Sequence, residues 1–256
     1  MSNVQQKAVP KTTETSSTIP GERLFVDTSS VSKHTSLGGA KIWLCVVDDA
    51  TGFVWNRVLR AKSEAPKKIQ QMIRKLHDRN TPVKYIRLDD AGEWKKLAKE
   101  CEESKEKFLR DVEFEFAGRN TPQRNGKVER KIAVMTRRIR STLNSAKLSK
   151  AYRQKLWGEC IMYLEDVENV LQSRKYEEPA YKAFFKKELE GLKALRQFGE
   201  VAYVKFGNKI KGKLRNRGIP MMYFGRPRKH SGDTYRLLNL ATDRVIHSRR
   251  SEEHTV

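Results

Sequence analysis

Three acidic residues, Asp27, Asp89 and Glu129, stand where the sequence could build a metal site. The first two end short runs of β-branched and aromatic residues that predict strands, and the third lies in the first turns of a strongly helical stretch. Carboxylates at the ends of neighbouring strands face one crevice of an open α/β sheet, and they are preferred ligands of Mg²⁺. Two such ions, roughly 3.5–4 Å apart, stabilise the attacking and leaving oxygens of a phosphodiester. The predicted chemistry is therefore the cutting and joining of nucleic acid.

Two other acidic residues, Asp48 and Asp49, also follow a predicted strand. A lone Asp after a strand is usually a turn residue or a helix cap. The Thr-Gly turn that comes immediately after this pair favours a structural role for both. The metal-site hypothesis therefore rests on Asp27, Asp89 and Glu129 taken together.

The elements that must position these residues follow from the hydrophobic pattern. Strands are predicted at residues 24–28, 41–48, 53–59, 83–88 and 112–116. Helices are predicted at residues 63–80 and 93–107, in a long stretch through 128–143, and from about 148 to 171. Three strands, a helix, a strand, a helix and a strand predict an α/β fold, a ribonuclease-H-like mixed five-stranded sheet flanked by helices.

After residue 198 the sequence pattern predicts strands and no helices. Short strands are predicted at residues 202–206, 218–225, 234–238 and 244–248, separated by Gly, Asn and Asp turns. Such spacing suits a small all-β barrel. We expect a second domain there.

The charge of the chain predicts a polyanionic partner. The formal net charge is +22, and no acidic residue occurs between Glu200 and Asp233. A field of this size raises both the affinity and the encounter rate for nucleic acid. Solvated surfaces are the alternative interpretation for the basic residues. The residues expected to contact DNA are Arg124, Asn125, Lys127, Arg130, Lys131, Arg137, Arg138, Lys211, Lys213, Arg215 and Arg217.

Several other classes of protein are disfavoured. Cys45, Cys101 and Cys160 are isolated, and no His pairs with a Cys at zinc-ligand spacing, so we expect neither a disulfide framework nor a zinc site. No apolar run is long enough to span a bilayer, and residues 1–20 lack the apolar core of a secretory signal. We expect a protein that is not secreted and has no membrane partner, with a disordered leader or linker at residues 1–20.

Three segments carry a resemblance to a known family. Residues 121–130, TPQRNGKVER, resemble the T-P-Q-x-N-G-x-x-E-R signature of copia-type retrotransposon integrases. Residues 87–94 look like that family's R-x-D-N-G-G-E-[YF] segment, and residues 46–55 like its [FV]-[IV]-D-D-x-[ST]-[RG]-[FY]-x-W segment. Asp90 and Ala91 depart from the pattern, since the family has Asn and Gly there.

The resemblance implies a function and a domain plan. It assigns Asp27, Asp89 and Glu129 as the D-D-E ligands for Mg²⁺, or Mn²⁺, in a polynucleotidyl transferase that trims DNA ends and joins them to target DNA. It implies a nuclear or cytoplasmic particle-associated homo-oligomer derived from a polyprotein. The implied plan is a catalytic core at residues 21–147, a helical extension and linker at 148–195, a basic SH3-like barrel at 196–250 and a tail at 251–256.

Two other functions remain open at this stage. A catalytically inactive nucleic-acid-binding remnant of a retroelement would keep the charge and the fold, and the departures at Asp90 and Ala91 favour it slightly. A ribonuclease-H-like nuclease or a Holliday-junction resolvase would need similar carboxylates, but it does not account for the motif at residues 121–130.

Overall fold

The structure is a computed structural model that describes residues 16–31, 33–117, 125–172, 176–192, 195–204, 218–228, 230 and 234–248. The chain divides into two compact units. Unit 1 comprises Met1–Ser29, Leu44–Trp55 and Ala61–Ile132, and unit 2 comprises Ser30–Trp43, Asn56–Arg60 and Ala133–Val256. These units do not coincide with the domain boundaries expected from the sequence, which stay a prediction.

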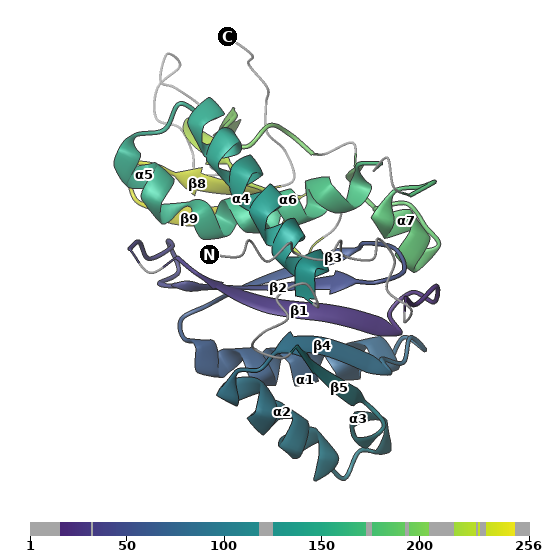
Figure 1. Cartoon of the computed structure of the whole chain (residues 1–256). Coiled ribbons are helices and arrows are strands. Elements are labelled where there is room, and N and C mark those ends of the chain that lie inside the picture. Colours follow the sequence, from purple (N-terminus) through teal and green to yellow (C-terminus); the bar gives the residue numbers. More distant parts are fainter. Residues whose placement is uncertain are drawn as a thin grey trace, which may run out of the picture. The chain divides into compact units, whose positions relative to one another are not determined.

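A mixed five-stranded sheet in the order β3-β2-β1-β4-β5 confirms the predicted ribonuclease-H-like arrangement (Figure 1). Its strands are β1 (Arg23–Ser30), β2 (Ile42–Asp48), β3 (Val54–Leu59), β4 (Tyr85–Asp89) and β5 (Glu113–Ala117). Backbone bonds from Lys41 N to Leu59 O and from Asp48 N to Phe53 O make β2 and β3 an antiparallel hairpin. β1 pairs with β4, and β4 with β5, in parallel.

The two faces of β1 and β4 differ in polarity. Leu24 and Val26 of β1 and Ile86 and Leu88 of β4 are fully buried. Successive residues of a strand point to opposite faces, so the other face carries Phe25 together with charged residues, among them Arg23 and Arg87. Asp27 and Asp89 therefore lie on the face opposite to these four buried residues.

Three helices gather beside β4 and β5 (Figure 1). They are α1 (Ala65–His77), which follows the 3-10 turn η1 (Lys62–Glu64), α2 (Gly92–Glu102) and α3 (Lys107–Arg110). The sequence predicted one helix over residues 93–107, and this was wrong at its end. The chain turns there because Ser104 Oγ accepts a bond from Glu106 N, while Glu106 pairs with Arg74 of α1.

The remaining helices are α4 (Gly126–Ser145), α5 (Lys150–Lys155), α6 (Trp157–Val170) and α7 (Ala180–Phe185). Val128, Met135 and Leu143 are buried, which confirms the predicted apolar stripe of α4. The single helix predicted from about residue 148 to 171 is instead two helices that meet at Leu156. The break coincides with a contact from a distant part of the sequence, because the backbone N–H of Leu37 bonds to the carbonyl of Lys155 at 2.7 Å.

A separate antiparallel sheet in the order β6-β7-β8-β9 confirms the predicted all-β texture near the C-terminus. Its strands are β6 (Val201–Val204), β7 (Ile219–Tyr223), β8 (Tyr235–Asn239) and β9 (Arg244–Ser248). One core of this sheet contains Ala202, Val204, Met221, Tyr223 and Leu237, with Tyr163 of α6 packed against it. Among the described residues, no helix combines the length and the apolar composition needed to cross a membrane.

Candidate active site

Asp27 and Asp89 lie at matching positions on neighbouring parallel strands. The register of β1 and β4 pairs Phe25 with Arg87. The same offset in sequence separates Asp27 from Asp89, so both lie one step further along the same face. Parallel pairing therefore brings two of the three predicted carboxylates side by side on one face of the sheet. Asp89 ends β4 as predicted, whereas the prediction that Asp27 ends its strand was wrong, because β1 continues to Ser30.

Glu129 approaches from α4, where it occupies the first helical turn. Its effect on Asp27 shows that the three residues share one electrostatic environment. Burial, and then the negative charges of Asp89 and Glu129, raise the pKa of Asp27 to about 6, although the backbone N–H of Thr28 opposes this shift. Asp27 is thus a partly buried carboxylate that feels two exposed like charges, an arrangement that a cation would stabilise.

The donor set suits Mg²⁺, because hard divalent cations prefer carboxylate oxygens. The side chains are nevertheless not gathered around one point: within the described ranges, no group of three or more His, Cys, Asp or Glu side chains could hold a metal ion. Like charges repel one another, so a cation would have to draw these carboxylates together. The residues fit a divalent cation by charge and chemistry, whereas the coordination geometry is not formed.

The start of α4 is tied to the strands that carry the site. Asn125 is 3% exposed, and its Nδ2 donates to the carbonyl of Val26 at 3.2 Å. Lys127 forms an ion pair with Asp49 and donates to the carbonyl of Asp49 at 2.6 Å. Its Nζ also lies 5.4 Å from the centre of the Phe25 ring. These contacts support positioning roles for Asn125 and Lys127, whose expected contacts with DNA stay predictions.

The structural role predicted for Asp48 and Asp49 is confirmed. Asp48 is fully buried, accepts a bond from Gly21 N at 2.7 Å, and accepts two more from the backbone and hydroxyl of Thr51. Asp49 accepts a bond from Ser17 N at 2.7 Å in addition to its pair with Lys127. Neither carboxylate is available to the cluster around Asp27.

Asp90, which replaces the Asn of the resembled motif, has its own cation. Its Oδ1 lies 2.9 Å from Nζ of Lys95 in α2. The carboxylates that raise the pKa of Asp27 are those of Asp89 and Glu129. The additional charge at position 90 is therefore compensated locally.

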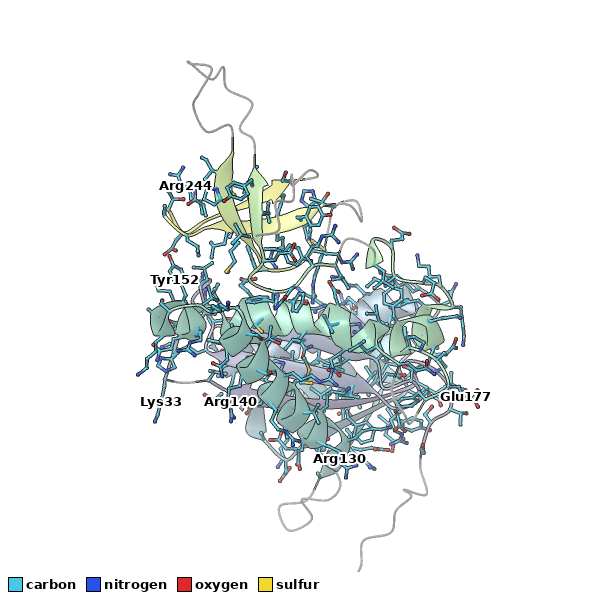
Figure 2. The ribbon with its side chains drawn as sticks, turned by 90° about the horizontal axis from the view of Figure 1, so that it is seen from above. Lys33, Arg130, Arg140, Tyr152, Glu177 and Arg244 are labelled. Atoms are coloured by element: carbon cyan, nitrogen blue, oxygen red, sulfur yellow. The ribbon has the colours of Figure 1, made fainter. Side chains whose placement is uncertain are left out.

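The basic residues expected to contact DNA differ in their surroundings. Arg130, Arg137 and Arg138 are exposed on α4. Figure 2 labels Arg130 and Arg140, which lie on this basic helix. Arg138 pairs with Glu168 of α6, and Lys131 is partly buried. Five predicted contacts lie outside the described residues: Arg124, Lys211, Lys213, Arg215 and Arg217.

Arg23, Arg87 and Glu115 form a charged cluster on the same face as the site, and it was not singled out from the sequence as a functional group. Arg23 and Arg87 both pair with Glu115. Alternation along the strands was the signal that could have revealed it, because Arg87 and Asp89 share one face of β4.

Comparison with known proteins shows that the chain is similar to a transposon polyprotein. Over 233 residues it is 28% identical to the retrovirus-related Pol polyprotein from transposon TNT 1-94 of Nicotiana tabacum. The match covers 88% of this chain but 16% of the polyprotein, so the chain spans a small part of that relative's length. No protein-family model matches the chain.

Among solved structures, the chain is similar to a chain from the cryo-EM structure of the simian T-cell lymphotropic virus intasome in complex with PP2A regulatory subunit B56 gamma. The TM-score is 0.48 and the sequence identity 13%, over 94% of this chain and 81% of that chain. A likeness this loose carries no conclusion about function.

Proposed function

We propose that the chain is a retrotransposon integrase core of the copia type, which trims DNA ends and joins them to target DNA through Asp27, Asp89 and Glu129. The observation that carries the proposal is the placement of Asp27 and Asp89 at matching positions on parallel strands, with Glu129 close enough to raise the pKa of Asp27. The likeness to a transposon Pol polyprotein supports the same function.

The three carboxylates would hold divalent cations, Mg²⁺ or Mn²⁺, against the DNA. Bound there, such cations lower the pKa of an attacking water or DNA 3′-hydroxyl and stabilise the leaving oxygen. Asp27 and Asp89 contribute ligands from a rigid sheet, which limits their movement. Asn125 and Lys127 hold the helix that carries Glu129 against that sheet.

The partners we propose are the ends of the element and the target DNA, bound by a homo-oligomer in the nucleus or in a cytoplasmic particle. The net charge of +22 supports a polyanionic partner. The exposed Arg130 and Arg137 on α4 are suited to contacting the phosphate backbone without reading sequence.

A Mg²⁺-dependent nicking and strand-transfer assay on labelled duplex and branched DNA tests the proposal. Asp89→Asn and Glu129→Gln should each lose activity by about a thousandfold or more, because the cations supply several kcal/mol of transition-state stabilisation. Asp90→Asn is the matched control, since Asp90 is adjacent and paired with Lys95, and it should retain activity. Equal products from the parent chain and from Asp89→Asn would contradict the assignment.

A non-catalytic DNA-binding remnant is the second candidate. It is favoured by the finding that the acidic side chains of the described residues do not form a metal-holding group. Thermal unfolding with and without Mg²⁺ or Mn²⁺ separates the two candidates without an activity assay. An integrase core should gain stability from the cation, and Asp27→Asn should abolish that gain, whereas a remnant that binds DNA should show neither effect.

A further inference from the structure

A cluster of two arginines and one glutamate lies on the face of the sheet that carries Asp27 and Asp89. Arg23 of β1 and Arg87 of β4 both pair with Glu115 of β5. Arg23 also lies over the ring of Tyr85, with its Cζ 4.4 Å from the ring centre. One carboxylate thus faces two guanidinium groups, which leaves an excess positive charge in a partly buried place.

Arg87 is held in a defined orientation within this cluster. Its Nε lies 2.9 Å from Oε2 of Glu115, and its Cζ lies 5.7 Å from the centre of the Phe25 ring. The Arg87 side chain is 15% exposed. In the part of the chain that the structure describes, neither terminal nitrogen of Arg87 donates a hydrogen bond. A guanidinium fixed through Nε and by an aromatic ring keeps these terminal donors for another acceptor.

The position of Arg87 indicates which acceptor this would be. Arg87 precedes Asp89 by one step on the same face of β4, and its register partner Phe25 precedes Asp27 by one step on β1. A phosphodiester that reached the carboxylates would therefore bring a neighbouring phosphate towards Arg87. Planar guanidinium groups bind phosphate oxygens through paired, charge-assisted hydrogen bonds.

We propose that Arg87 binds a phosphate of the DNA next to the reacting bond, with Glu115 as the residue that positions it. The substrate class rests on the proposed function. Arg23 and Arg87 share the single carboxylate of Glu115, so the three side chains together carry one excess positive charge. This excess is consistent with an anionic partner. The competing interpretation is that Arg87 only stabilises the sheet through its pair with Glu115.

The salt dependence of DNA binding distinguishes the two interpretations. Each phosphate contact on duplex DNA contributes about −0.9 to the slope of log affinity against log salt concentration. Arg87→Gln should therefore make the slope shallower by about 0.9 and weaken binding at moderate salt by about tenfold. Fluorescence anisotropy of a labelled branched duplex in EDTA measures both quantities without catalysis.

Arg74→Gln is the matched control. It removes the same formal charge from unit 1, but Arg74 lies on α1 and pairs with Glu106. Its slope should equal that of the parent. The proposal would be overturned if Arg87→Gln changed the salt slope of the parent by no more than Arg74→Gln does. This holds even if Arg87→Gln unfolds at a lower temperature.

Folding of the variant is expected, since Glu115 keeps Arg23 as a partner when Arg87 is replaced. If Arg87→Gln does not fold, Arg87→Met takes its place, because Met retains an apolar stem against Phe25 and removes only the charge and the donors. The same slope criterion applies to it. A parent chain that binds DNA with the expected Arg87 effect but joins no strands in Mg²⁺ would contradict the proposed enzyme alone, and a parent that does not bind DNA would overturn both.

Discussion

At the scale of single residues, burial and two neighbouring carboxylates act on Asp27 in the same direction. They raise its pKa from 3.8 to about 6. Between these two values the folded chain binds more protons than the unfolded chain, so this residue's contribution to stability falls as pH rises through that window. Above pH ~6 the full cost of an ionised, crowded carboxylate is present.

Replacing Asp27 should therefore stabilise the chain in a pH-dependent way. We expect Asp27→Asn to raise the free energy of unfolding by on the order of 1–2 kcal/mol at pH ~8, after allowance for solvent screening, with the gain disappearing near pH ~4. Urea denaturation at a series of pH values measures this. A gain of equal size at both ends of the series would indicate a packing effect instead of a charge effect.

At the scale of elements, the attachment of α4 depends on a buried acidic residue. Asp49 has a side chain that is 5% exposed, and Lys127 provides its cation. Removing one partner of such a pair leaves an uncompensated charge. The start of α4, and with it Glu129, is therefore held by an interaction whose loss has a measurable cost.

Lys127→Met should lower the free energy of unfolding by about 3 kcal/mol, and the double variant Lys127→Met with Asp49→Asn should recover most of it. Lys96→Met is the control, because Lys96 is 76% exposed and its pair with Glu100 contributes at most about 0.5 kcal/mol. Chemical denaturation provides the measurement. If Lys127→Met unfolds like the parent but binds DNA more weakly, Lys127 is a DNA contact, as the sequence predicted.

At the scale of the whole molecule, the C-terminal sheet belongs to the same unit as α6. Three ion pairs connect them: Arg226 with Asp166, Arg228 with Glu165, and Arg236 with Glu159. Glu165 is buried, and burial raises its pKa although Arg228 and Arg57 act in the opposite direction. Tyr152 of α5, which is labelled in Figure 2, belongs to the same unit. Its hydroxyl donates to the carbonyl of Leu240, in the turn between β8 and β9, at 2.7 Å.

A chain that ends at residue 195 should consequently be less stable than the full chain. It would leave Asp166 without Arg226 and Glu165 without Arg228, and we expect the melting temperature to fall by about 10 °C. Glu165→Gln with Asp166→Asn in the shortened chain should restore part of the loss. Differential scanning calorimetry measures both effects. An unchanged melting temperature would support the domain boundary at residues 195 and 196 that the sequence suggested.

The sequence by itself determined the elements and the candidates for chemistry. Alternation and apolar runs depend on neighbours a few residues apart, so they were sufficient to place the strands and to set Asp89 at a strand end, although β1 continues past Asp27 to Ser30. They also identified the turn after Asp48, in which Thr51 donates two hydrogen bonds to the Asp48 carboxylate. The helix boundaries at Glu102 and Leu156 were missed because bonds from other parts of the chain, such as Leu37 N to Lys155 O, decide them.

Only the tertiary structure determined which charged side chains form ion pairs with one another. Lys127 lies two residues before Glu129 in sequence, yet its partner is Asp49. Arg87 pairs with Glu115 across the register that links β4 to β5. Such pairs depend on how strands and helices far apart in the chain are aligned, which no local periodicity records. The same alignment brings Asp27, Asp89 and Glu129 into one electrostatic environment, and this is the physical basis of the proposed site.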